Sequence, residues 1–351
     1  MKTIRNSKQY DLIDLSKYIG SVFVVFIHTL PDGIGEQLGN VIGRFAVPFF
    51  LIVSAYFYTN KLSKNDEGDR NRLIIQYVAR IFRLYLFWMI LNSPFILYNS
   101  VNYFRSSTFG IWKTSLLFVL SCVYNAVPGY GISWYLTTSM FSAAILGRLY
   151  FKHSSLSLLF YTLPFFLISV FSSTYGSLIR KMGPIAQLRA LFSPANSLFA
   201  GLFFFSLGMV LFDHRHFWMV HVSKPVLISI TVLALICSIV EANVAIHYNL
   251  PYAAGTTDQY FMLFPLSFFL VVLCLKFQVK LSFAKICRKA STVTYLSQFI
   301  FIFSIKFFCM KLNLNINQYF LALLTVAGTF ILFLILNSFE KKFPRFLKYA
   351  F

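Results

Sequence analysis

The sequence is short of charged residues, which make up only 12% of its 351 positions. Hydrophobic residues account for 58%, and the mean hydropathy is +0.70. A soluble globular chain carries about a quarter of its residues as charged side chains. The composition therefore excludes an ordinary soluble protein of one or two domains and indicates a protein that spans a membrane several times.

Acidic residues are scarcer still, because 11 Asp and Glu stand against 31 Lys and Arg, for a formal net charge of +20. An excess of this size first suggests a nucleic-acid partner. A nucleic-acid binder collects its basic residues on one water-facing surface, whereas here they form short clusters between apolar runs. We therefore expect no nucleic-acid partner.

The five cysteines show no paired spacing, and most of them lie within apolar runs. They are Cys122, Cys237, Cys274, Cys287 and Cys309. A thiol in such a run behaves as a small hydrophobic group. We therefore predict neither a disulfide framework nor a metal site.

Apolar runs recur along the whole chain at about the twenty-residue length that spans a bilayer. Ten of them occupy residues 12–30, 41–59, 81–98, 133–151, 155–172, 196–212, 225–246, 259–275, 291–310 and 318–337, and a shorter one occupies 111–125. The pattern predicts an all-α, polytopic protein in which residues 1–351 form a single membrane domain, with no soluble domain.

The distribution of basic residues decides whether the short run crosses the membrane, because cytoplasmic loops are enriched in Lys and Arg. If residues 111–125 do not cross and the N-terminus is cytoplasmic, 22 basic residues lie inside, 6 lie outside and 3 lie within spans. If the run crosses, 13 lie inside and 15 outside. We therefore predict about ten transmembrane helices, cytoplasmic N- and C-termini, and a re-entrant or interfacial segment at 111–125 on the outer side.

Ionisable residues inside the spans are candidates for function, because a charged group at the bilayer centre costs about 3 kcal/mol on insertion scales. Lys17 and His28 in the first run are eleven residues apart, on nearly the same helix face and about 16 Å apart along the axis. Asp14, Gly20, Ser21 and Val24 share that face. Either this face is a polar seam inside the bundle, or Lys17 snorkels to the interface beside Asp14 and His28 lies among the headgroups.

Arg80 and Arg83 lie at the start of the third run, one helical turn apart and therefore on one face. Two guanidinium groups at the cytoplasmic mouth can hold the phosphates of a nucleotide-like donor. The alternative is that both are anchors that follow the positive-inside rule.

The remaining candidates lie in the other apolar runs. Arg44 precedes Pro48, whose missing N–H leaves a backbone group that others must satisfy, and it either lies near the interface or lines a cavity. Ser54 follows on the same run, and Trp134 fits an aromatic belt. Glu241, near the outer end of the seventh run, is expected to face His28 or Arg44.

Five motifs occur in order along the chain. They are Asp14 and Lys17 followed by His28, GRFAVPFFLIVSAYFY from Gly43, RIFRLYLFW from Arg80, SWYLTTSM from Ser133 and STVTYLSQFIF from Ser291. In this order the chain resembles membrane acyltransferase family three, bacterial multi-span enzymes that O-acylate cell-envelope carbohydrates. It departs from the family pattern at Lys17 (usually arginine), Ala55 (usually glycine) and Gln298 (usually histidine).

The resemblance implies transfer of an acyl group, expected to be acetyl, from cytoplasmic acyl-coenzyme A to a hydroxyl of an extracytoplasmic or lipid-linked carbohydrate. It gives catalytic roles to His28, as general base or acyl carrier, and to Lys17 and Asp14. Arg80 and Arg83 would then bind the coenzyme, which is the co-substrate, and no metal would be needed. Substrate or oxyanion contacts would come from Arg44, Ser54, Trp134 and Glu241.

The same resemblance implies a multi-pass protein of the plasma or inner membrane, surrounded by membrane lipid and acting on a carbohydrate acceptor. Two alternatives stay open from the sequence. One is an exporter or flippase of a polysaccharide or lipid-linked sugar, in which the polar seam of the first run lines a pathway without acyl transfer. The other is a structural subunit of an envelope-polymer synthase.

Overall fold

A computed structural model describes residues 10–31, 33–65, 67–107, 109–179, 194–251, 257–340, 342–347 and 349–351. Its longest described α-helices, of 17 residues or more, are α1 (Asp11–Thr29), α3 (Ala46–Leu62), α4 (Glu67–Leu91), α8 (Ser155–Phe171), α13 (Lys224–His247), α15 (Ala284–Lys311) and α16 (Gln318–Glu340). Helices of intermediate length are α5 (Ser93–Ser106), α6 (Ile111–Tyr124), α7 (Trp134–Leu149), α11 (Leu198–Asp213) and α14 (Leu263–Lys276). Short helices are α2 (Ile34–Glu36), α9 (Gly176–Ile179), α12 (Arg215–Val220) and α17 (Pro344–Leu347).

Six helical stretches in the described ranges are long and apolar enough to cross a membrane. They are Asp11–Thr29, Ile34–Leu62, Asp69–Leu91, Lys224–His247, Ala284–Lys311 and Gln318–Glu340. Shorter apolar helices, α6, α8, α11 and α14, accompany them. The predicted all-α, polytopic membrane fold is confirmed at this level.

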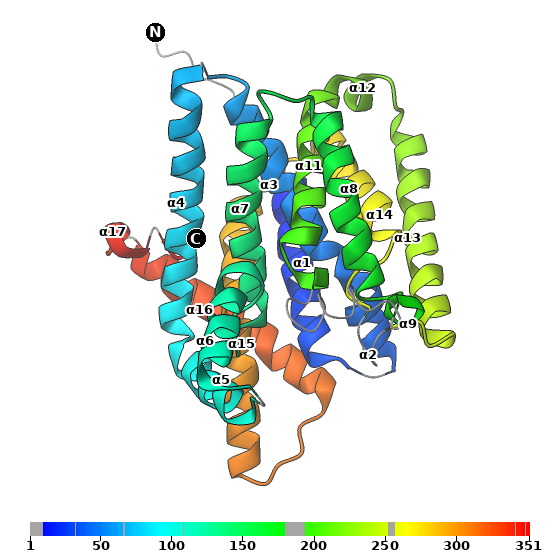
Figure 1. Ribbon diagram of the computed structural model, residues 1–351. Helices are drawn as coiled ribbons and strands as arrows, with labels where there is room; N and C mark the ends of the chain where they lie inside the picture. The colour runs from blue at the N-terminus through cyan, green and yellow to red at the C-terminus, as the bar shows by residue number, and fades with distance from the viewer. Residues whose placement is uncertain are drawn as a thin grey trace.

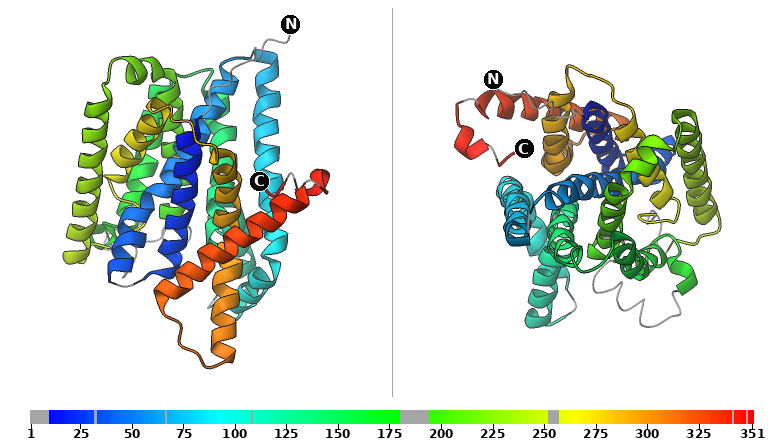
Figure 2. Two further views of the ribbon diagram at one scale, coloured as in Figure 1. Left: turned by 180° about the vertical axis from the view of Figure 1, so that it is seen from behind. Right: turned by 90° about the horizontal axis from the view of Figure 1, so that it is seen from above.

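The helices form one bundle (Figure 1). Seen from above, α3 and α11 lie toward the middle, with α13 on one side and α16 on the other (Figure 2). Helix α11 is buried around its whole circumference from Ala200 to Phe212. Its sequence is accordingly apolar on every face rather than amphipathic. The end of α3, the start of α4 and α12 lie at one end of the bundle, and α2, α5 and α9 lie at the other (Figure 1).

Close approach of α3 and α11 depends on Gly208. A Cβ atom placed on Gly208 would lie 2.3 Å from the carbonyl oxygen of Ile52 and 2.6 Å from the Cβ of Ala55. Ala55 is the residue that replaces the family's usual glycine, so the glycine that the contact needs is supplied by the opposite helix. The bundle core is thereby kept tightly packed despite the departure from the motif.

The boundaries predicted for the third run were wrong. Residues 81–98 straddle a break, because α4 ends at Leu91 and α5 begins at Ser93 with Pro94 in its first turn. Proline disfavours helical geometry in the residue before it, and the Asn92 side chain donates hydrogen bonds to the carbonyls of Trp88 and Leu296 at the break. Arg80 therefore lies near the middle of α4 and not at its start.

The ambiguous run forms α6, which has 14 residues. At 1.5 Å per residue this helix is about 21 Å long, shorter than the roughly 30 Å hydrocarbon core. Figure 1 shows α5 and α6 together at the end of the bundle away from α12. This placement agrees with a segment that enters from one side, while its non-crossing character stays a prediction.

Helix α3 is entered through an irregular stretch. A π-helical turn at Gln37–Val41 is followed by a 3-10 turn at Ile42–Phe45, and regular α-helix starts at Ala46. Pro48 falls in the first turn of α3, where a missing N–H is tolerated. Departures from α-helical geometry are frequent at functional sites, and Arg44 lies within this one.

Candidate functional site

A cavity of about 250 Å³ lies beside the last turn of α1, and His28 is part of its wall. The wall consists of Val24, Ile27, His28, Arg44, Val47, Pro48, Asn125, Ala126, Gly131, Ile132, Trp134, Asn196, Asp258, Gln259 and Tyr295. We call this space the His28 cavity. It brings together three residues predicted from the sequence, His28, Arg44 and Trp134.

Arg44 is held by two partners on the wall of the His28 cavity. Its Nη1 lies 2.6 Å from Oδ1 of Asp258, and its Nη2 donates to Oδ1 of Asn40 at 2.8 Å. Both charged side chains are largely buried, at 13% exposed for Arg44 and 18% for Asp258. Arg44 Nε is buried and has no hydrogen-bond partner in the described part of the chain. The guanidinium is therefore fixed in position, with one N–H still unpaired.

The loop that carries Asp258 is fastened to two neighbouring elements. Thr257 Oγ1 donates to the carbonyl of Asn40 at 3.1 Å, and Tyr260 Oη donates to the carbonyl of Val41 at 2.7 Å. The backbone N–H of Asp258 donates to Ser173 Oγ at 2.9 Å. These bonds join the loop to the π-helical turn before Arg44, so that Asp258 meets Arg44 in a defined geometry.

The His28 ring lies 4.9 Å from the ring of Phe299, centroid to centroid, at an angle of 51°. The opposite charges of Arg44 and Asp258 both act on the imidazole. A base that takes a proton becomes a cation, and a nearby carboxylate stabilises that cation while a guanidinium opposes it. Because Arg44 and Asp258 form an ion pair, their opposite charges lie close together, and both act on His28.

A second group of charges lies toward the other end of α1. Arg288 of α15 donates to both carboxylate oxygens of Asp14, with Nε 2.9 Å from Oδ1 and Nη2 2.6 Å from Oδ2. Asp14 is 6% exposed in this pair, whereas Arg288 is 59% exposed. The charges of Asp14, Arg288 and Arg80 act on Lys17. We call Lys17, Arg80 and Arg288 the cationic cluster.

The two arginines of α4 differ in their surroundings. Arg80 lies over the ring of Tyr77 at 5.6 Å and belongs to the cationic cluster. Arg83 lies over the ring of Tyr349 at 5.7 Å, near the end of the chain. Both side chains are exposed, and the described residues show no ion pair between either arginine and an acid. Of the two arginines, Arg80 is the one whose charge acts on Lys17.

Ser54 lies outside the His28 cavity. Its Oγ is hydrogen bonded to Tyr135 Oη at 3.4 Å. The charge of Arg80 acts on Tyr135. Ser54 therefore joins α3 to α7 on the side of Arg80.

Trp134 and Glu241 have surroundings that differ from those expected. Trp134 is 7% exposed and lines the His28 cavity, so it is not a lipid-facing belt residue. Glu241 accepts hydrogen bonds from Tyr175 Oη at 2.6 Å and from the backbone N–H groups of Phe261 and Met262. Its carboxylate thereby satisfies donors just before α14, and it does not line the cavity that holds His28 and Arg44.

Gln298, at the place of the family's late histidine, is fully buried on α15. Its Nε2 donates to the carbonyl of Tyr295 at 2.8 Å, and its Oε1 has no partner in the described part of the chain. It does not line the His28 cavity. The amide is therefore turned toward its own helix rather than toward His28.

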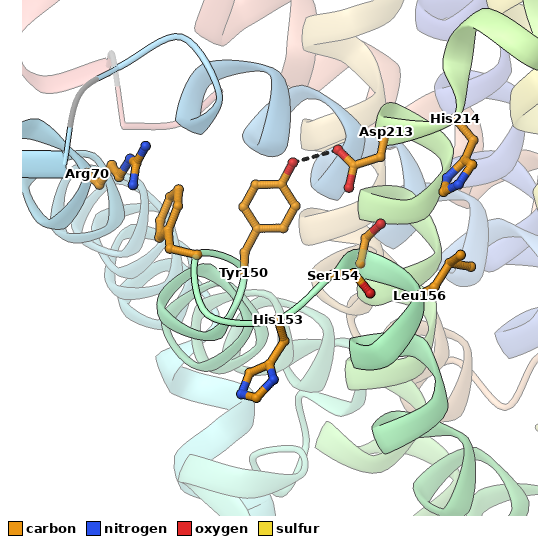
Figure 3. Close-up of a pocket in the computed structure, with 9 residues that line it drawn as sticks. Arg70, Tyr150, His153, Ser154, Leu156, Asp213 and His214 are labelled. Atoms are coloured by element: carbon orange, nitrogen blue, oxygen red, sulfur yellow. Dashed lines mark hydrogen bonds between the residues drawn. The ribbon is translucent and has the colours of Figure 1, made fainter.

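A hollow of about 490 Å³ lies at the opposite end of the bundle, between the ends of α4, α7 and α11. Figure 3 shows Tyr150 pointing at Asp213, with its Oη donating to Oδ1 at 2.6 Å. Arg70 lies 4.0 Å above the ring of Phe151. These contacts tie three helix ends together, and none of the predicted site residues lines this hollow.

Two residues of the site, Asp258 and Arg288, were not predicted from the sequence. With only 11 acids in the chain, a buried Arg44 must find a partner among very few, and this scarcity was a usable signal for Asp258. Arg288 was counted only as a topological charge. Its partner Asp14 is 274 positions away, and no local pattern connects them.

The comparisons with known proteins found a family that covers most of the chain and a relative that covers a quarter of it. The profile of the family described as "Acyltransferase domain" matches residues 10–337. A protein named "Amino-acid racemase" from Enterococcus faecalis is 36% identical over 92 residues, which cover 25% of this chain and 13% of that protein. No solved structure matches. Because the family match covers almost all of the helical bundle that holds the His28 cavity, the chain belongs to membrane acyltransferase family three.

Proposed function

We propose that the protein moves an acyl group, acetyl in the simplest case, from cytoplasmic acyl-coenzyme A to a hydroxyl of an extracytoplasmic or lipid-linked carbohydrate. One observation carries the proposal. The single helix α1 bears His28 in the wall of a cavity and Lys17 in the cationic cluster, about 16 Å apart along its axis. An extended pantetheine arm is long enough to reach over a distance of this size, from the cationic cluster to His28.

In this proposal the cationic cluster receives the phosphates of the coenzyme. Arginine side chains bind phosphate through several N–H donors at once, and Arg80 is exposed and unengaged by an acid among the described residues. Lys17 adds a charge beside it. Asp14 holds Arg288 in place and so shapes the cluster from the α15 side.

The chemistry at the other end is a transfer from sulfur to oxygen. His28 takes the proton of the acceptor hydroxyl while the oxygen attacks the thioester carbon. The C–O bond forms, the C–S bond breaks, and the proton passes from His28 to the departing coenzyme thiolate, which leaves as the thiol. The unpaired N–H of Arg44 Nε is a donor for the oxyanion that develops on the thioester carbonyl.

The proposal includes the topology. Ten spans with both termini cytoplasmic place the cationic cluster on the donor side and the His28 cavity toward the outer side of a plasma or inner membrane. The basic segments predicted as cytoplasmic, at the end of α3, the start of α4 and α12, lie at one end of the bundle (Figure 1). The positive-inside rule assigns that end to the cytoplasm.

The test uses inverted membrane vesicles supplied with acetyl-coenzyme A labelled in its acetyl group. We expect label in alkali-labile esters of envelope carbohydrate with the natural protein, and its loss with His28→Ala. His247→Ala is the matched control, because His247 is exposed at the end of α13, outside the cavity. Undiminished labelling with His28→Ala would remove the catalytic role of His28. No acetyl-coenzyme A consumption with the natural protein would favour an exporter.

A further inference from the structure

Three aromatic side chains from three helices pack together inside the bundle. Phe50 of α3 lies 6.0 Å from Tyr135 of α7 and 5.8 Å from Tyr295 of α15, ring centroid to ring centroid. The two tyrosine rings lie 5.4 Å apart at an angle of 71°. Phe50 is 6% exposed and Tyr295 is 4% exposed. We call these three rings the aromatic partition.

The aromatic partition lies between the cationic cluster and the His28 cavity. A Cβ atom on Gly20 would lie 3.0 Å from Cε1 of Phe50, so this ring packs against α1 at Gly20. Gly20 is one turn beyond Lys17, and the next residue along this face of α1, Val24, already lines the cavity. The polar face of α1 is therefore interrupted by Phe50 at Gly20, between Lys17 and His28 and nearer to Lys17.

Each tyrosine of the partition faces a different side. Tyr135 bonds to Ser54 and is acted on by the charge of Arg80, so it faces the cationic cluster. Tyr295 lines the His28 cavity, and its Oη donates to the carbonyl of Ile132, another wall residue. The two sides of the bundle thus meet at the contact between these two rings.

We propose that the aromatic partition is the gate through which the acyl group reaches His28, and that its closure sets the size of the acyl group the enzyme accepts. This inference rests on the proposed function, because it presupposes a donor on one side and an acceptor on the other. A thioester arm reaching from the cationic cluster toward His28 has to displace these rings. A short acyl group needs a small displacement, and each further methylene needs a larger one.

The contacts of the partition are suited to reversible opening. The hydrogen bonds that hold the two tyrosine hydroxyls are long, at 3.4 Å for Tyr135 and 3.3 Å for Tyr295. Hydrogen bonds between oxygens are strongest near 2.7 to 2.8 Å, so these two restrain the rings only weakly. Close packing, rather than polar bonding, keeps the partition shut.

The experiment measures the ratio of hexanoyl to acetyl transfer from the two labelled coenzyme A thioesters in inverted vesicles. In Tyr135→Ala and Tyr295→Ala the packed ring is gone, and we expect the ratio to rise by about tenfold or more, because one extra methylene in a packed hydrophobic pocket changes discrimination by about 10- to 200-fold. Tyr135→Phe and Tyr295→Phe keep the rings and should keep the ratio of the natural protein. Tyr56→Ala is the matched control, because Tyr56 is a buried tyrosine of α3 whose ring contacts are with Phe57 and Phe212.

The outcomes separate the gate from the proposed function. If the natural protein transfers acetyl and the ratio stays constant in both alanine variants, the gate is overturned while the function stands. If the natural protein transfers neither acyl group, the proposed function itself fails. An equal rise in the ratio with Tyr56→Ala would show general loosening of the bundle and would also overturn the gate. Where an alanine variant does not accumulate, Tyr135→Leu and Tyr295→Leu apply the same test with a smaller loss of volume.

Discussion

Arg288 donates two hydrogen bonds to Asp14, of 2.9 Å from Nε and 2.6 Å from Nη2, and so links α15 to the first helix. The family motif has an arginine where this chain has Lys17, and lysine lacks the planar two-pronged donor. In this protein a two-pronged donor to Asp14 comes from Arg288 instead. Lys17 itself forms no ion pair with an acid among the described residues.

Removing the ion pair between Arg288 and Asp14 is expected to destabilise the bundle. Arg288→Ala leaves the buried carboxylate of Asp14 without its two donors, and we expect a loss of about 1 to 3 kcal/mol in the free energy of unfolding. Unfolding in mixed micelles by added denaturing detergent measures it. Asp14→Asn combined with Arg288→Ala should cost less than the sum of the two single changes. Additive losses would show that the pair contributes no coupling.

Asp258 is expected to matter for turnover through Arg44. Asp258→Asn keeps the size of the side chain but leaves the positive charge of Arg44 uncompensated beside His28. That charge opposes the imidazolium formed as His28 takes a proton, so we expect the maximal rate of acetyl transfer to fall by about 10- to 100-fold, with a smaller change in the apparent affinity for acetyl-coenzyme A. Asp213→Asn, which alters a hydrogen-bonded acid far from the cavity, is the control. Equal effects of the two changes would argue against the role of Asp258.

Substitutions of the two arginines of α4 are expected to have different effects on the apparent affinity for acetyl-coenzyme A. Arg80→Ala should raise the concentration of acetyl-coenzyme A needed for half-maximal transfer by about tenfold, equivalent to about 1.4 kcal/mol of lost phosphate binding. Arg83→Ala should have a smaller effect, because Arg83 lies against Tyr349 and outside the cationic cluster. Initial rates in inverted vesicles measure both. An unchanged apparent affinity in Arg80→Ala would make it a topological anchor only.

The features that the sequence predicted correctly are those that a local pattern encodes. The apolar runs predicted the helices, and the eleven-residue spacing put Lys17 and His28 on one face of the continuous helix α1. Pro94 marked a helix boundary that was overlooked, because the apolar run continues through it and hydropathy alone does not register a break. The polar start of α4 was likewise missed, because the helix extends into the polar residues 67–72, where hydropathy gives no helix signal.

Pairings between distant segments were beyond local patterns. Arg44 was predicted either to lie near the outer interface or to line a cavity, yet nothing near it in the sequence identifies Asp258 on a loop between α13 and α14. Glu241 was the more conspicuous acid because it lies within an apolar run, but its oxygens accept backbone N–H groups before α14. The choice between two acids therefore depended on tertiary packing.

The contact between α3 and α11 gives a last test, directed at the fold. Gly208→Ala puts a methyl group 2.3 Å from the carbonyl oxygen of Ile52 and 2.6 Å from the Cβ of Ala55, so the two helices have to separate. Overpacking of this kind costs about 1 to 3 kcal/mol, and we expect a lower melting temperature in detergent.

Adding Ala55→Gly to Gly208→Ala removes one of the two clashes and leaves the one with the backbone of Ile52. The double variant should therefore recover part of the lost stability and not all of it. Gly110→Ala is the control, because a Cβ at Gly110 meets no atom within 4 Å. A melting temperature of Gly208→Ala equal to that of Gly110→Ala would mean that α3 and α11 do not approach as closely as their glycine requires. Full recovery in the double variant would show that the clash with Ala55 causes the whole loss of stability. Gly208 alone would then compensate for the replacement of the family's glycine by Ala55.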